Sequence, residues 1–97
     1  MAKLVVTYPA QPGATFDRDY YLNVHLPLAQ KHFGPAGMTG SEALFPLTSD
    51  AALLCVGILH FDSPEAIGAA MAVPGAGEVM ADVAKFTNVQ PTATPMA

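Results

Sequence analysis

The alternation of apolar and polar residues along the chain predicts six elements in the order strand, helix, strand, strand, helix, strand. Short β-branched or apolar runs bounded by turn residues indicate strands, and apolar residues at helical spacing indicate helices. We place these elements, in chain order, at residues 3–8, 16–33, 41–47, 51–61, 64–84 and 85–90. The tail at 92–97 has no clear pattern and is expected to be loose.

The boundaries of both helices follow from the residues that flank them. Asp17 is suited to cap the first helix, because its carboxylate accepts N–H bonds from the first turn. The Gly- and Pro-rich segment 34–40 ends that helix. Ser63 and Pro64 form a matching start for the second helix, which the segment Val-Pro-Gly-Ala-Gly at 73–77 interrupts.

The strand at 51–61 is apolar on both faces, which is typical of a central strand in a sheet covered on both sides. The β-α-β-β-α-β order is the ferredoxin-like arrangement, in which a four-stranded antiparallel sheet carries both helices on one face. A second copy of the chain, packed sheet on sheet, is the simplest cover for the other face. We therefore expect residues 1–97 to form a single α+β domain that assembles as a homodimer.

Composition supports this interface and excludes several classes of function. Hydrophobic residues make up 52% of the 97 residues and charged residues only 12%, which leaves apolar surface for an interface or a pocket. The net charge is −4, and Lys3, Arg18, Lys31 and Lys85 form no basic patch, so a nucleic-acid partner is not expected. No apolar run approaches the roughly 18 residues of a membrane span. A single cysteine, Cys55, and no signal-peptide pattern favour the cytoplasm.

The predicted first helix carries a histidine and a proline among its apolar residues. His25 lies near the middle of the apolar arc and should point between helix and sheet. Pro27 has no backbone N–H, so the carbonyl of Asn23 loses its partner and the helix should bend close to His25. Such a bend would hold the helix slightly off the sheet and leave a cavity with one imidazole in it. We expect Tyr21 and Leu28 to line this cavity.

Structural roles are the alternatives at these positions. An inward His25 is also typical of a core residue bonded to a backbone carbonyl, and Pro27 is compatible with a tolerated kink. Tyr20 is most simply a packing residue. His32 lies near the helix end, where an imidazolium favours the dipole, and His60 closes a strand at the surface or an interface. The three histidines lack metal-ligand spacing, so no metal is expected.

The predicted last strand adds two weaker candidates. Phe86 and Asn88 alternate onto one face of residues 85–90. If this face is the helix side, Asn88 is placed to orient a substrate carbonyl.

The first helix resembles the signature of the EthD family, named for a protein of ethyl tert-butyl ether degradation. The family pattern is Phe-Asp, a Tyr-Tyr pair, then His-x-Pro-Leu, and the segments HFDSPEAI and DVAKFTNVQP add further similarity. The second-strand region, GMTGSEALFPLTSD, departs from the more glycine-rich family pattern. The matching helix positions are Phe16, Asp17, Tyr20, Tyr21, His25, Pro27 and Leu28.

The resemblance implies a ferredoxin-like protomer, a homodimer whose sheets form an α/β barrel, and a cavity lined by the helix histidine. Relatives of this fold include cofactor-independent monooxygenases, decarboxylases and isomerases. We expect a small hydrophobic ligand, uncharged or weakly anionic, with His25 as general acid or base and no cofactor. The alternative is a non-catalytic accessory or carrier protein of a hydrocarbon- or ether-degrading oxygenase system.

Overall fold

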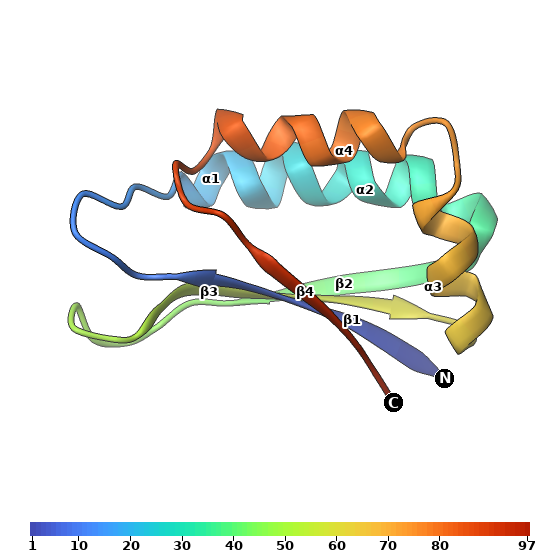
Figure 1. Cartoon of the computed structure of the whole chain (residues 1–97), viewed down its shortest axis with the longest axis horizontal. Helices are drawn as coiled ribbons and strands as arrows, with labels where there is room; N and C mark the ends of the chain where they lie inside the picture. The colour runs from blue at the N-terminus through green and yellow to red at the C-terminus, as the bar shows by residue number, and fades with distance from the viewer.

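The computed structural model describes residues 1–97 as one antiparallel sheet with all of its helices on one face (Figure 1). The sheet order is β2-β3-β1-β4, and every neighbouring pair is antiparallel. The strands are β1 (Ala2–Pro9), β2 (Met38–Leu44), β3 (Leu53–Phe61) and β4 (Thr92–Met96). The helical segments are α1 (Arg18–Tyr20), η1 (Tyr21–His25), α2 (Leu26–Phe33), η2 (Gly34–Ala36), α3 (Pro64–Met71), α4 (Ala76–Asp82) and η3 (Val83–Lys85). This is the predicted ferredoxin-like fold.

Both predicted helix starts are confirmed. The Asp17 carboxylate accepts a hydrogen bond from the backbone N–H of Tyr20 at 3.0 Å. The Ser63 hydroxyl accepts one from the N–H of Ala66 at 3.2 Å, and Pro64 occupies the first turn of α3. These caps fix where α1 and α3 leave the sheet, so the helices return across the same face (Figure 1).

The first helix is irregular just before Pro27. Residues Tyr21–His25 form a π-turn, closed by a hydrogen bond from the Leu26 N–H to the Tyr21 carbonyl. Pro27 follows at once in α2, which continues the same helix, so the wide turn lies where the missing N–H interrupts the regular ladder. The predicted disturbance of the ladder near His25 therefore takes the form of one wide turn, a feature frequent at functional sites.

The π-turn also changes which residues of this helix face inward. Leu22 and Val24 belong to the apolar arc of a uniform helix, yet they are 44% and 43% exposed. Tyr21, His25 and Leu26 are buried. A π-turn holds one residue more than an α-helical turn. Fewer apolar side chains of this helix therefore face the sheet than uniform α-helical spacing predicts.

The last strand lies later than predicted. Residues 85–90 are not a strand; they leave η3 and make a single bridge, Phe16 to Thr87. The tail, expected to be loose, forms β4 and pairs with β1 from Thr7↔Thr92 to Lys3↔Met96. The tail has little alternation of apolar and polar residues, so its sequence does not predict a strand. Backbone pairing with an existing strand does not require such a pattern. Each residue of β4 is exposed at the sheet edge, and the strand contains Pro95.

The second strand also begins earlier than predicted. β2 covers Met38–Leu44 rather than residues 41–47, and its pairing with β3 slips between Met38 and Gly40. Met38 is buried, so it anchors the start of the strand in the core. Pro46 lies beyond the strand end, as its missing N–H requires.

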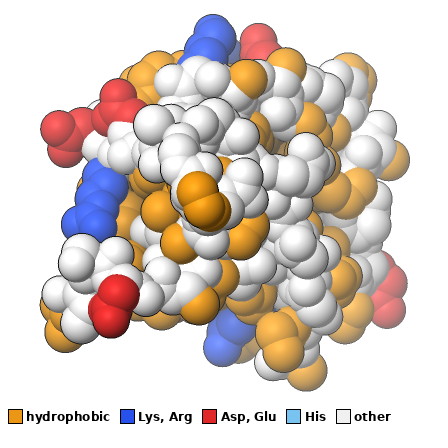
Figure 2. Space-filling view, turned by 60° about the vertical axis from the view of Figure 1, so that its left-hand side comes forward, with side chains coloured by type: hydrophobic (Ala, Val, Ile, Leu, Met, Phe, Trp, Pro, Cys, Tyr) orange, Lys and Arg blue, Asp and Glu red, His pale blue; other side chains and the backbone are white.

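The two faces of β3 differ as its alternation predicts. Cys55, Leu59 and Phe61 are buried against the helices. Val56 and Ile58 are only half-buried on the opposite face, which no helix covers (Figure 1). Figure 2 shows hydrophobic side chains spread over one face of the molecule, with the few charged groups near its margins.

No single helix is long and apolar enough to cross a membrane, although the bent pair Pro64–Met71 and Ala76–Lys85 passes by length and composition alone.

Candidate functional site

A cavity of about 190 Å³ lies between the helices and the sheet. Of the 16 residues that line it, 13 are hydrophobic, so its walls offer few polar contacts. β1, the first helix and α4 each supply one wall of the cavity. The lining residues include Tyr8, Tyr21, His25, Leu26, Val79 and Gln90. The predicted cavity is therefore present, and His25 lines it.

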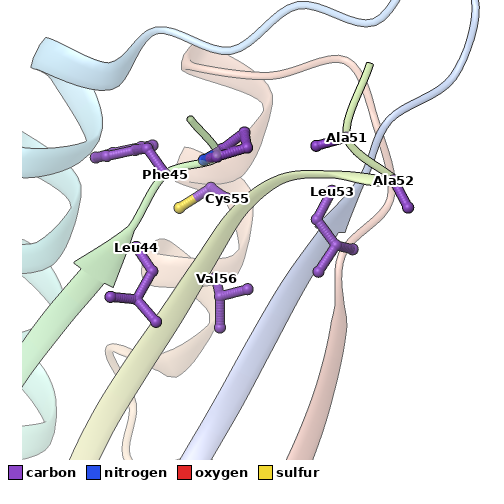
Figure 3. Close-up of a pocket in the computed structure, with 8 residues that line it drawn as sticks. Leu44, Phe45, Ala51, Ala52, Leu53, Cys55 and Val56 are labelled. Atoms are coloured by element: carbon purple, nitrogen blue, oxygen red, sulfur yellow. The ribbon is translucent and has the colours of Figure 1, made fainter. Parts of the chain in front are cut away.

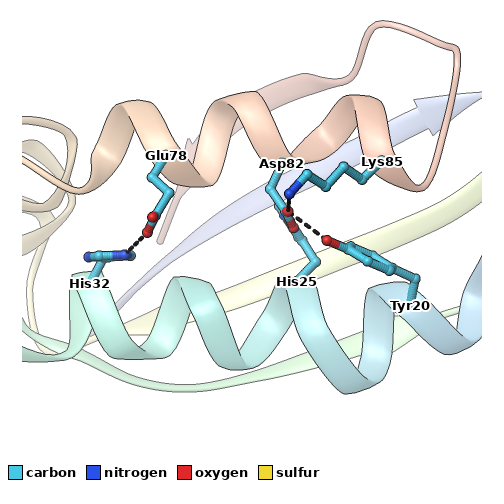
Figure 4. Close-up of polar contacts among 6 residues, drawn as sticks. All are labelled: Tyr20, His25, His32, Glu78, Asp82 and Lys85. Carbon is cyan, nitrogen blue, oxygen red and sulfur yellow. Dashed lines mark hydrogen bonds and ion pairs between the residues drawn. The ribbon is translucent and has the colours of Figure 1, made fainter.

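The imidazole of His25 is held by a buried carboxylate on the neighbouring helix. Its Nδ1 lies 3.0 Å from Oδ2 of Asp82, and the two residues are 7% and 5% exposed. The Tyr20 hydroxyl donates to Oδ1 of Asp82 at 2.8 Å, and the Lys85 ammonium lies 3.9 Å from the same oxygen. Figure 4 shows these groups meeting between the first helix and the α4–η3 segment.

The protonation state of this pair follows from its surroundings. Burial disfavours the charged form of Asp82, but hydrogen bonds from Tyr20 and His25 outweigh it and lower the pKa of the carboxyl. Burial lowers the pKa of His25 below 6.5, and the bond to Asp82 offsets this only in part. At neutral pH, Asp82 is therefore ionised and His25 is neutral.

This state fixes the tautomer of His25. A carboxylate can only accept hydrogen bonds, so the Nδ1 of His25 carries the proton and donates it to Asp82. The Nε2 of a neutral imidazole is then an unprotonated acceptor, since the hydrogen bond to Asp82 is made through Nδ1. His25 thus lines the cavity and keeps one basic lone pair.

Two aromatic rings fix the plane of the imidazole. The Tyr21 ring stacks on it with centroids 5.5 Å apart and an interplanar angle of 20°. The Phe86 ring lies 4.6 Å away at 56°. Together with the Asp82 bond, these contacts leave the ring of His25 little freedom to turn.

Beneath the cavity, three buried groups stay protonated at neutral pH. Burial raises the pKa of the Tyr8 and Tyr21 hydroxyls well above the ordinary value of 10. Burial also raises the pKa of the Cys55 thiol to about 12. These residues can serve as walls and hydrogen-bond donors, but His25 is the group at the cavity suited to exchange protons near neutral pH.

The structure separates the remaining predicted site residues. Tyr21 lines the cavity, and Phe86 contacts the His25 ring from outside the cavity lining. Leu28 is half-buried against the core and does not line the cavity. Asn88 is exposed; its amide accepts from the Thr15 N–H at 2.9 Å and donates to the Gly13 carbonyl at 2.9 Å.

The sequence did contain a signal for Asp82. Ala76, Val79 and Asp82 are the buried residues of α4, and they repeat at a spacing of three. An acid on the apolar stripe of a short helix is uncommon and needs a partner. Asp82 was nevertheless not predicted as the carboxylate that orients His25.

The other two histidines also pair with carboxylates, away from the cavity lining. His32 pairs with Glu78 across α2 and α4 (Figure 4). His60 Nε2 lies 3.0 Å from Glu42 between β3 and β2. Both partners are exposed, which agrees with the structural or surface roles expected for these histidines.

A second hollow, of about 310 Å³, lies where β2 ends and β3 begins (Figure 3). Its walls are apolar and include Leu44, Phe45, Leu53 and Val56. The one titratable group among its lining residues is the Cys55 thiol, which is protonated at neutral pH. This hollow therefore has no proton-transfer group comparable to His25.

Fold and cavity together define the class: a ferredoxin-like α+β protein with a histidine-containing apolar pocket between sheet and helices. Residues 12–90 match the EthD domain, so the chain belongs to the EthD family. A search of curated proteins finds no match.

Solved structures show the same fold. An EthD-like protein from Ralstonia eutropha JMP134 is 28% identical, with a TM-score of 0.81 over 97% of this chain and 87% of that one. SnoaB, a cofactor-independent oxygenase from Streptomyces nogalater, is 14% identical, with a TM-score of 0.61 over 96% and 89%. A dimeric protein of unknown function from Bacteroides fragilis is 9% identical, with a TM-score of 0.55 over 97% and 92%.

Proposed function

We propose that this protein binds a small hydrophobic molecule beside His25 and uses that imidazole as a general acid and base. The observation that carries the proposal is the buried Asp82 bonded to Nδ1 of His25, a residue that lines the apolar cavity, so that Nε2 keeps its lone pair. A positioned imidazole of this kind accelerates proton transfer by roughly 10²–10⁴-fold. Tyr20 and Lys85 act as positioning residues, since both contact Asp82 rather than the cavity.

The proposed chemistry is proton abstraction from a carbon or oxygen acid held against Nε2. Such a step can feed oxygenation, decarboxylation or isomerisation. The neighbour described as a cofactor-independent oxygenase supports the first of these, on the basis of fold alone. The proposal does not require a cofactor.

We further propose that the working unit is a homodimer formed through the uncovered sheet face. Val5 and Ile58 stand opposite each other on adjacent strands and are only half-buried on that face. An apolar sheet face is typically covered in a stable fold, and a two-fold pair covers both copies at once. The neighbour from Bacteroides fragilis is described as dimeric, which supports a dimer of this fold.

The competing function is a non-catalytic carrier that delivers a hydrophobic compound to an oxygenase system. The carrier would need the cavity but not the basic lone pair of His25. The buried Asp82 favours the catalytic proposal, because a carboxylate that fixes the tautomer of His25 adds nothing to apolar binding.

Deuterium exchange at the methyl group of acetophenone, followed by NMR in D₂O, tests the proposal. We expect the protein to accelerate this exchange and His25→Ala to remove the acceleration, a fall of roughly 10²–10⁴-fold. Leu28→Ala is the matched control, since Leu28 lies on the next turn of the same helix but does not line the cavity. Acetophenone binding without any His25-dependent exchange would reject catalysis and leave the carrier function.

A further inference from the structure

The size of the cavity limits what can lie beside His25. A cavity of about 150 Å³ lined by aliphatic and aromatic side chains accommodates benzene. The present cavity, at about 190 Å³, is only slightly larger. One six-membered ring with a short substituent fits this space, whereas fused two- and three-ring systems require the walls to move.

The charge around the cavity limits the ligand further. The chain has four Lys and Arg residues, and none of them lines the cavity. Arg18 lies over the ring of Phe45, 4.7 Å from its centroid, and Lys85 lies beside Asp82. Asp82 itself is ionised, directly behind the imidazole. An anionic ligand would therefore be buried without a cation and next to a negative charge.

The polar groups that line the cavity determine where a bound ligand can place its own hydrogen-bonding groups. His25 and Gln90 are the polar residues that line the cavity apart from the Tyr8 and Tyr21 hydroxyls. Tyr8 and Tyr21 are each 1% exposed, while Gln90 is exposed at the surface. A buried ligand oxygen thus finds its main partner in Nε2 of His25, and the rest of the ligand contacts apolar walls.

We infer that the ligand class of this cavity is a neutral single-ring aromatic molecule with one hydrogen-bonding group, such as a simple phenol or aryl ketone, directed at His25. This inference rests on the proposed function for the role of His25. It narrows the ligand in two respects: a second fused ring is disfavoured by the volume of the cavity, and a carboxylate is disfavoured by charge.

Four probes measured by calorimetry against the full chain test the inference. They are 4-methylphenol, 4-methylbenzoate, 2-naphthol and anthrone, which vary charge and ring number around one scaffold. We expect 4-methylphenol to bind at least about tenfold more tightly than each of the others, because even one methylene too many in a hydrophobic pocket changes binding by about 10–200-fold. Equal binding of 2-naphthol, anthrone or 4-methylbenzoate would overturn the inference.

A cavity-enlarging variant provides the reciprocal test. Leu26 lines the cavity, so Leu26→Ala should admit 2-naphthol and raise its affinity to about that of 4-methylphenol. Leu28→Ala removes the same side chain outside the cavity and should leave the ranking unchanged. If Leu26→Ala does not fold, Val79→Ala enlarges the opposite wall and carries the same expectation. A gain for 2-naphthol in Leu28→Ala but in neither cavity variant would overturn the inference.

The His25→Ala variant distinguishes failure of the inference from failure of the proposed function. If 4-methylphenol binds equally to the variant and the parent, and acetophenone exchange is also unchanged, the role of His25 is wrong. If both depend on His25 while larger or anionic probes bind as well as 4-methylphenol, only the ligand class is wrong.

Discussion

Asp82 determines which nitrogen of His25 is available for chemistry. Its carboxylate accepts the Nδ1 proton, and the Tyr20 hydroxyl and the Lys85 ammonium hold the carboxylate in place from the other side. The same bond raises the pKa of His25, against the larger lowering by burial. Asp82 therefore affects the basicity of the imidazole as well as its orientation.

Asp82→Asn should lower the pKa of His25, because the negative charge that stabilises the imidazolium is removed while burial remains. We expect the acidic limb of the pH–rate profile for acetophenone exchange, where His25 becomes protonated, to move to lower pH, with a slower plateau. The control is Glu78→Gln, which removes the corresponding charge beside His32 and should leave the profile in place. An unshifted profile in Asp82→Asn would show that the pair has no role in proton transfer.

The stability of the fold should fall on mild acidification because of His25. Its folded pKa is lowered, so between that value and 6.5 the unfolded chain binds more protons than the folded chain. The free energy of unfolding is therefore highest above pH 6.5 and decreases as the pH falls through this window. Urea titrations between pH 7.5 and about pH 5 measure it.

His25→Ala should flatten this part of the stability curve, at a cost of about 1–3 kcal/mol at neutral pH for the unpaired Asp82 oxygen. His60→Gln, which alters an exposed pair, should keep the pH dependence of the parent. Parallel curves for the parent and His25→Ala would contradict the assignment of a neutral, buried His25.

The candidate site was partly predictable from residues alone. His25 could be placed because its own helix has a long apolar pattern and a cap, so its direction follows from local spacing. Asp82 is 57 positions away, and its position relative to His25 depends on the break before α4 and on how α4 packs on α2. Phe86 was predicted near the site on the wrong element, and Asn88 bonds instead to the loop before α1.

At the scale of elements, Tyr21 of the π-turn brings the first helix into close contact with the sheet at one point. The Tyr21 hydroxyl lies where a side chain on Gly57 of β3 would begin, so only glycine fits there. The turn that carries Tyr21 also carries His25, and the two rings stack. The contact with β3 therefore fixes the depth at which the imidazole enters the cavity.

Gly57→Ala should force Tyr21 out of its position and destabilise the protein by about 1–3 kcal/mol, as overpacking of a core does. Tyr21→Phe removes the obstructing oxygen, so the double variant should recover part of that loss. Gly40→Ala on β2 is the control, because its added methyl group meets no atom. Chemical denaturation of the four variants measures the coupling, and strictly additive losses would contradict the close contact.

Some elements were predictable from their own residues, whereas others depend on contacts with distant parts of the fold. The caps Asp17 and Ser63 and the apolar run of β3 are local signals, and each predicted its element. β4 has no such signal: its five residues are exposed, and it exists because β1 offers an unpaired edge. The start of β2 depends similarly on Met38 reaching the core.

At the scale of the whole molecule, the proposed homodimer would cover the sheet face that carries no helix. We expect light scattering to give twice the 10.1 kDa mass of one chain at micromolar concentration. Ile58→Lys places a charge on the half-buried face and should yield folded monomers, since burying an unpaired ammonium is costly. Leu22→Lys adds the same charge at an exposed apolar position on the helix side and should remain dimeric. A monomeric parent, or a dimeric Ile58→Lys, would contradict this interface.

Neither edge of the sheet is suited to pair with an additional strand. At one edge, Pro95 interrupts the row of N–H donors that a further strand would need. At the other, the slip between Met38 and Gly40 distorts β2 where an incoming strand would begin to pair. In the proposed homodimer, the partner covers the broad face of the sheet, and neither edge strand is suited to pair with another chain. We therefore expect concentrated solutions of this very apolar chain to resist fibril formation, and Pro95→Thr to shorten the lag before thioflavin fluorescence rises.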